Sequence, residues 1–142
     1  MPLTYAVGDV HGRRDLLDAL LEAIEADATA RGDEPRIVFV GDIVDRGPES
    51  RQALDRVIAT LDAHPGSRLI LGNHEEFMLH FIDEPGRQRE RVARLWFANG
   101  GVATLASYGF GEGERVDTIA ERFARDFAPH VEALRAADWM VE

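Results

Sequence analysis

The sequence predicts an α/β fold: a parallel βαβαβ sheet flanked by helices, with a helical C-terminal portion. Three short apolar segments with the composition of β-strands alternate with helical patterns, and each runs into a glycine followed by polar residues. The segments are 3–7, 36–40 and 67–71. The glycines that follow them recur about every 30 residues, the length of one βαβ unit.

The first half of the chain gives these elements in order. Residues 3–7 form the first expected strand, which ends at Gly8. The next segment has helical spacing and ends near Gly32; its apolar positions are Leu16, Leu17, Leu20, Leu21 and Ile24. Residues 36–40 are almost continuously apolar, as expected for a strand buried on both faces.

A second helical pattern follows Gly47 and Pro48 and stops at His64–Gly66. Residues 67–71 are then the third expected strand, which leads directly into the segment Gly72–Glu75. Because right-handed crossovers place the ends of parallel strands at one edge, the polar residues after all three strands should meet in space.

From Glu75 onward the apolar spacing predicts helices. We therefore expect a single domain over 1–142, with residues 1–75 as the βαβαβ core and 76–142 as the helical portion. Residues 139–142 resemble the opening of another strand with none following, which predicts a truncated domain.

Composition excludes several classes of protein. With 142 residues, of which 45% are hydrophobic and 30% charged, the chain has the composition of a globular protein. The sequence has no apolar run of the roughly 18 residues that a membrane span needs, and we expect a cytoplasmic protein with no membrane partner. The net charge of -10 argues against a nucleic-acid partner, and the absence of cysteine leaves only oxygen and nitrogen ligands for a metal.

The residues after the strands form a ligand set for divalent metals. Asp9, His11, Asp42 and Asn73 offer carboxylate, imidazole and amide donors. Asp42 lies in the middle motif and can bridge two cations, one oxygen on each. Two such ions about 3.5–4 Å apart would clamp a phosphoryl group and lower the pKa of a shared water, so the pattern predicts hydrolysis of a phosphate ester.

Three further residues fit the rest of that reaction. His74, next to Asn73, is placed to protonate the leaving alkoxide. Asp45 is the carboxylate expected to orient His74, and the Arg46 guanidinium suits phosphate oxygens.

The three motifs resemble those of the calcineurin-like metallophosphoesterases. The Asp45-Arg46-Gly47 and His74-Glu75 extensions resemble the bacterial branch of the phosphoprotein phosphatases. The resemblance implies that Asp9, His11 and Asp42 bind a first metal and that Asp42 and Asn73 bind a second. It also implies catalytic roles for His74 and Asp45 and phosphate binding by Arg46. We expect Asn73 to bind the substrate phosphate as well. Manganese is the first expectation for both ions, with iron and zinc also suited.

The resemblance implies that the chain corresponds to the N-terminal half of a two-sheet sandwich. The other half of such enzymes supplies two more metal-binding histidines and usually another arginine. None of His64, His80 and His130 lies in such a motif, and we expect His130 to be a solvated residue in the first turn of a helix.

We interpret the parent activity as a serine/threonine protein phosphatase acting on phosphorylated proteins or small phosphoesters. A symmetrical dinucleoside tetraphosphatase is the alternative; such relatives tend to carry Asp after the motif histidine, where this chain has Glu75. A third possibility is an inactive truncated fragment that binds metal, or that self-associates through the uncovered sheet face.

Overall fold

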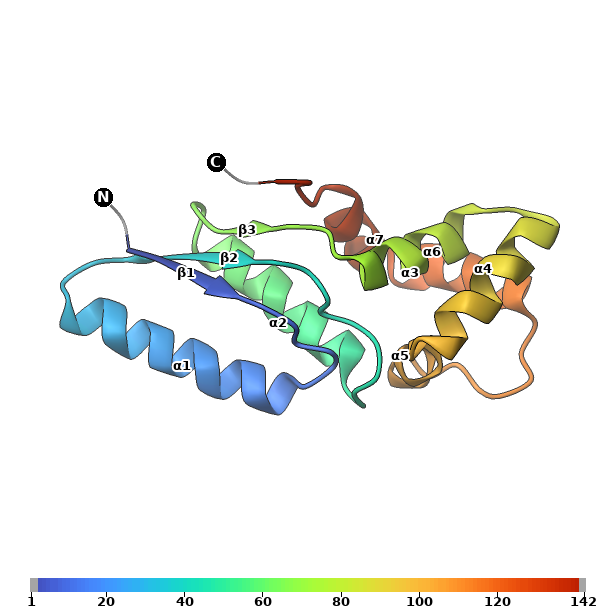
Figure 1. The fold of residues 1–142 in the computed structure, drawn as a ribbon, viewed down its shortest axis with the longest axis horizontal. Coiled ribbons are helices and arrows are strands. Elements are labelled where there is room, and N and C mark those ends of the chain that lie inside the picture. Colours follow the sequence, from blue (N-terminus) through green and yellow to red (C-terminus); the bar gives the residue numbers. More distant parts are fainter. Residues whose placement is uncertain (1–2, 141–142) are drawn as a thin grey trace.

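The computed structural model describes residues 3–140 and confirms the α/β prediction (Figure 1). Three strands and seven helices lie within this range. In chain order they are β1 (Leu3–Val7), α1 (Arg14–Ala30), β2 (Pro35–Phe39), α2 (Ser50–Ala63), β3 (Arg68–Leu69), α3 (Asn73–Asp83), α4 (Gly86–Ala98), α5 (Gly101–Ser107), α6 (Val116–Asp126) and α7 (Ala128–Arg135).

The strands form one parallel sheet in the order β1-β2-β3. Val7 is paired with Phe39, and Phe39 is paired with Leu69, so the three strands end nearly level. Helices α1 and α2 cover the same face of the sheet in Figure 1. The polar segments after all three strands therefore leave from one edge, as the sequence predicts.

Successive side chains along each strand point to opposite faces of the sheet, and the two faces differ in how well they are covered. Tyr5 of β1 points toward α1, where its hydroxyl donates a hydrogen bond to Asp27 Oδ2 at 2.7 Å. Ile37 is fully buried on this side, whereas Ala6 on the other face is exposed. Val40, just after β2, is 44% exposed, so part of the second face lacks a covering layer within residues 3–140.

The third strand is shorter than the predicted 67–71. Its regular pairing with β2 covers only Arg68 and Leu69. Ile70 N still donates to Phe39 O at 2.8 Å, and Ile70 also forms an isolated parallel bridge with Asp138 on its other side. Two backbone hydrogen bonds hold this bridge, from Leu71 N to Asp138 O and from Asp138 N to Leu69 O. The chain after α7 thus returns beside β3 at Asp138, one residue before the segment 139–142 that the sequence predicts as the start of a strand. Trp139 and Met140 are not part of a strand, and residues 141 and 142 lie outside the described part.

Helices α3 to α7 pack together beyond the carboxyl ends of the strands (Figure 1). Their interior holds three fully buried rings, Phe81, Trp96 and Phe123, which join the sheet side chains in one apolar cluster. None of the helices described is long and apolar enough to cross a membrane.

The prediction for His130 is wrong. Its side chain is buried in α7, where Nδ1 pairs with the Tyr108 hydroxyl at 2.7 Å and Nε2 pairs with Asp55 Oδ1. Pro129 correctly indicates the first turn of a helix, but α7 packs on α2 with this face inward.

Candidate functional site

The loops after the three strands are joined to one another by backbone hydrogen bonds. His11 N donates to Asp42 O at 2.9 Å, and Gly12 N donates to Ile43 O at 2.8 Å. Gly47 N donates back to His11 O at 3.0 Å. These bonds connect the main chains of the two loops, so the first and second motifs form one hydrogen-bonded unit at the edge of the sheet.

The backbone of this unit is strained. Among residues 3–140, five non-glycine residues have a positive φ, and all five are predicted site residues: Asp9, His11, Asp42, Asp45 and Arg46. Left-handed backbone is disfavoured for residues with a Cβ and concentrates at functional sites. The strain thus falls on the residues that the motifs single out.

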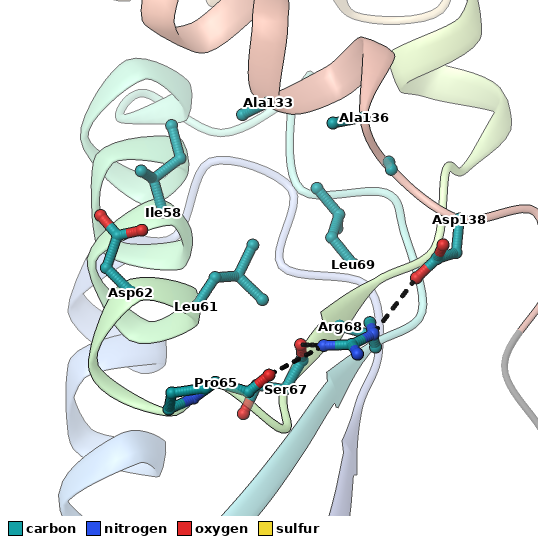
Figure 2. A pocket seen from close by; sticks show the side chains of 11 residues that line it. Ile58, Leu61, Asp62, Pro65, Ser67, Arg68, Leu69, Ala133, Ala136 and Asp138 are labelled. Atoms are coloured by element: carbon teal, nitrogen blue, oxygen red, sulfur yellow. Dashed lines mark hydrogen bonds and ion pairs between the residues drawn. The ribbon is translucent and has the colours of Figure 1, made fainter.

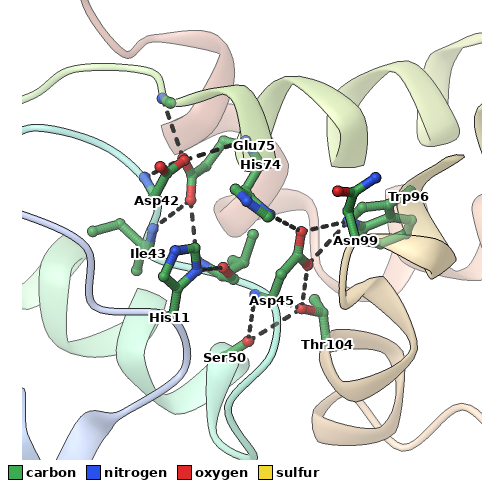
Figure 3. Close-up of polar contacts among 12 residues, drawn as sticks. His11, Asp42, Ile43, Asp45, Ser50, His74, Glu75, Trp96, Asn99 and Thr104 are labelled. Atoms are coloured by element: carbon green, nitrogen blue, oxygen red, sulfur yellow. Dashed lines mark hydrogen bonds and ion pairs between the residues drawn. The ribbon is translucent and has the colours of Figure 1, made fainter.

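Ligand atoms of His11, Asp42 and His74 lie within 4.8 Å of one another (Figure 3). The two imidazole rings meet edge to face, with their centroids 4.7 Å apart. His11 Nδ1 lies 2.9 Å from the carbonyl oxygen of Val44, which can only accept, so Nδ1 carries the proton. In the neutral ring this arrangement leaves the lone pair on Nε2, the form of imidazole that binds a metal.

His74 is held by a buried carboxylate. Its Nδ1 donates to Asp45 Oδ2 at 2.7 Å, and Asp45 is fully buried (Figure 3). This bond fixes the tautomer and the ring orientation, which leaves Nε2 of His74 for a proton transfer or an ion. The pairing agrees with the orienting role predicted for Asp45.

Two residues from the helical portion complete the environment of Asp45. Trp96 Nε1 lies 2.9 Å from both carboxylate oxygens, and the Thr104 hydroxyl donates to Oδ1 at 2.6 Å. Burial raises the pKa of Asp45, and the hydrogen bonds from Thr104, His74 and Trp96 oppose that rise. The carboxylate is thus removed from water but supplied with donors.

Glu75 is a second buried carboxylate behind the site. It is fully buried, and its oxygens accept hydrogen bonds from the backbone N–H groups of Asp42, Ile43, Val44 and Gly72 (Figure 3). Burial raises the pKa of Glu75, while the N–H groups of residues 42–44 act in the opposite direction.

The other predicted residues lie around this centre. Asp9 is exposed after β1, and its carboxylate is not among the ligand atoms that gather within 4.8 Å. Asn73 is exposed at the first position of α3, and its neighbour His74 donates its backbone N–H to Asp42 Oδ1 at 3.3 Å. Arg46 is also exposed, and its backbone N–H donates to Gly100 O at 3.1 Å.

Glu75, Trp96 and Thr104 are not among the predicted site residues. A signal was available for Glu75, since an acidic residue three positions after a helix N-cap commonly accepts the N-cap N–H, as Glu75 does from Gly72 at 3.2 Å. Trp96 and Thr104 lie more than 50 residues from Asp45 in sequence and carry no such local signal.

The donor set fits a divalent metal. Imidazole nitrogen and carboxylate oxygen are ligands that manganese, iron and zinc share. His11 and Asp42 are only half-buried, so an ion can reach them, and the hydrogen bond from His11 to Val44 is of the kind that orients metal ligands.

An apolar hollow lies away from this centre. It has a volume of about 270 Å³ and lies between α2, β3 and α7 (Figure 2). Its interior includes Ile58, Leu61 and Leu69, and Arg68 on its rim pairs with Asp138 at 3.8 Å. The described residues that line this hollow include none of the predicted site residues, so the hollow is separate from the candidate site.

Comparisons with known proteins agree with this geometry. Residues 3–139 match the family model for the calcineurin-like phosphoesterases. The chain is 43% identical over 72 residues to a symmetrical bis(5'-nucleosyl)-tetraphosphatase from Janthinobacterium sp. (strain Marseille), a match that covers 51% of this chain and 24% of that protein. It is 41% identical over 76 residues to the enzyme of that name from Coxiella burnetii (strain RSA 493 / Nine Mile phase I), covering 54% of this chain and 23% of the relative.

Among solved structures, a cold-active protein tyrosine phosphatase is 32% identical with a TM-score of 0.43, over 70% of this chain and 33% of that one. The matched part of the chain spans about a quarter of the length of the two tetraphosphatases. Because the family model covers nearly the whole sequence, the chain belongs to the calcineurin-like phosphoesterase family.

Proposed function

We propose that this chain carries the nucleophile-generating and proton-donating part of a metal-dependent phosphoester hydrolase. The observation that carries the proposal is the gathering of His11, Asp42 and His74 at the ends of the strands, with Asp45 buried behind His74. A ligand cluster beside an oriented imidazole provides the two groups that hydrolysis of a phosphate ester needs.

His11 and Asp42 would hold a divalent metal, with Asp9 and Asn73 as further ligands from the same loops. Two divalent ions there, manganese first among the candidates, would supply a water of lowered pKa and neutralise charge on the phosphoryl oxygens. Asp42 would serve both ions in this proposal, because it follows β2, the middle strand of the sheet, and so lies between the other two motifs.

The protein groups have separate tasks. His74 holds a proton at Nε2 and delivers it to the leaving oxygen, while Asp45 keeps its Nδ1 protonated and stabilises the imidazolium. Arg46, whose side chain forms no ion pair among the described residues, binds phosphate oxygens through its guanidinium fork. Asn73 lies at the N-terminus of α3, where backbone N–H groups also favour a phosphate.

For the substrate we place dinucleoside polyphosphates first. Relatives at 41–43% identity over half of this chain are named symmetrical bis(5'-nucleosyl)-tetraphosphatases, and this supports a dinucleoside tetraphosphatase over a serine/threonine protein phosphatase. Phosphoserine or phosphothreonine in proteins is the second candidate, which Glu75 and the Asp45-Arg46 pair favour. Self-association through the partly uncovered sheet face is a further proposal, and sedimentation velocity of the chain tests it.

The first experiment measures hydrolysis of p-nitrophenyl phosphate with and without manganese, with Asp42→Asn and His74→Asn as site variants and His80→Asn as the matched control. His80 is exposed on α3, and its substitution should leave turnover unchanged. We expect manganese-dependent turnover that both site variants lose. Turnover that persists in folded Asp42→Asn would refute the bridging role.

The second experiment compares a dinucleoside tetraphosphate with a phosphoserine peptide under the same conditions. Preference for the peptide would reverse the order of the two substrate classes. If the folded chain hydrolyses none of the three substrates, it does not carry a sufficient active site.

A further inference from the structure

Glu75 connects the metal-ligand loop to helix α3 through four hydrogen bonds. Oε1 accepts from Ile43 N at 2.6 Å and from Val44 N at 3.0 Å. Oε2 accepts from Asp42 N at 2.8 Å and from Gly72 N at 3.2 Å. Because both oxygens are occupied by backbone donors, this carboxylate is not free to bind a metal or a substrate.

Three of the donors are consecutive, and such an arrangement needs an unusual backbone. Successive N–H groups that point to one side form an anion-binding concavity, which requires a left-handed residue within or beside it. Here that residue is Asp42, with φ of 54°. A buried anion bound to these N–H groups stabilises a conformation that a residue with a Cβ rarely adopts.

The segment held by Glu75 carries or contacts two groups of the ligand cluster. Asp42 is itself a member, and the Val44 carbonyl accepts the hydrogen bond that fixes the His11 ring. His74, the third member, is the residue immediately before Glu75 on α3. One carboxylate therefore connects all three groups without contacting a reacting atom.

The packing leaves little room for the loop to find another position. A Cβ added at Gly72 would lie 2.5 Å from Asp42 N and 2.7 Å from Glu75 Oε2. The main chain of the third motif thus lies directly against the Asp42 segment, and the carboxylate fills the space between them.

We propose that Glu75 is the positioning residue of the metal site: it holds the segment 42–44 so that Asp42 and His11 present their ligand atoms together. The inference rests on the proposed function only in taking Asp42 and His11 as ligands. Residues that orient metal ligands in this way typically change metal affinity 10- to 100-fold when substituted.

The test is manganese affinity, measured by isothermal titration calorimetry on the wild-type chain, Glu75→Gln and Glu76→Gln. Glu76 is the neighbouring half-buried acid on α3 and is the matched control. We expect folded Glu75→Gln to bind manganese at least about tenfold more weakly, and Glu76→Gln to bind as the wild type does. A merely structural role would lower the melting temperature and leave the affinity of the folded protein unchanged, and that result would overturn the proposal.

Amide hydrogen exchange on the metal-free wild-type chain gives a second, independent measurement. The N–H groups of Asp42, Ile43 and Val44 should exchange as slowly as those of β2. If Glu75→Gln does not fold, this comparison tests whether the Glu75 carboxylate holds the segment 42–44. Fast exchange of these three in the folded protein would mean that the carboxylate does not hold the loop. If the wild type binds no manganese, the proposed function fails, while exchange still tests the hydrogen bonds of Glu75.

Discussion

Replacing Trp96 with Phe should destabilise the fold through Asp45. The substitution keeps an aromatic ring against Phe81, whose centroid lies 5.1 Å away, but removes the indole N–H that lies 2.9 Å from both Asp45 oxygens. A hydrogen bond to a charged group contributes about 1.5–3 kcal/mol, and the lost ring volume adds about 1 kcal/mol. We therefore expect the free energy of unfolding to fall by about 2.5–4 kcal/mol.

Urea unfolding followed by circular dichroism measures this change, and Trp139→Phe is the matched control. Trp139 is 74% exposed, so the same substitution there should change stability by no more than about 0.5 kcal/mol.

A double-mutant cycle separates the hydrogen bond from the packing. In an Asp45→Asn background the acceptor is neutral, and a neutral hydrogen bond contributes only about 0.5–1.5 kcal/mol. Trp96→Phe should then cost about 1 kcal/mol less than in the wild type. A coupling energy near zero would refute the reasoning, because it would mean that the indole does not stabilise the charge on Asp45.

Three other predictions concern Gly72, Tyr108 and Arg46. Gly72→Ala should lower the free energy of unfolding in urea by about 1–3 kcal/mol and weaken manganese binding, because the added Cβ would lie 2.5 Å from Asp42 Oδ1. Gly66→Ala is the control and should leave stability unchanged, because the atom nearest to its Cβ would be 3.8 Å away. Burial raises the pKa of Tyr108 above its value of 10.0 in the unfolded chain, so the stabilisation that comes from the neutral hydroxyl is fully present below pH 10.0. The free energy of unfolding should therefore fall as the pH rises above 10.0, and Tyr108→Phe should flatten that fall. A pH profile that Tyr108→Phe leaves unchanged would contradict the raised pKa. Arg46→Gln should lower kcat/KM for p-nitrophenyl phosphate by about 10- to 100-fold with the melting temperature unchanged, and equal kinetics would remove Arg46 from phosphate binding.

The sheet and the meeting of the three loops were predictable because their signals are local. An apolar run that ends in a glycine and an acidic residue marks the end of a strand, and the spacing of the motifs sets the parallel order. The pairing of His74 with Asp45 also followed from the chemistry of the two residue types.

The contacts made by the helical portion were not predictable in the same way. Trp96 and Thr104 reach Asp45 only because α4 and α5 pack beyond the strand ends, and apolar spacing shows that a helix has a buried face without showing what that face contacts. The error at His130 has the same origin, since its partners Tyr108 and Asp55 come from distant segments.

The left-handed residues at the site affect how this chain should respond to selection for heat resistance. Each such residue with a Cβ costs about 1–3 kcal/mol, and glycine at His11, Asp42 or Arg46 would relieve that cost. The same exchange would delete a side chain that the proposed chemistry requires. Random variants chosen only for a higher melting temperature should therefore accumulate glycine at these positions and lose metal binding, whereas selection for turnover should preserve the strain.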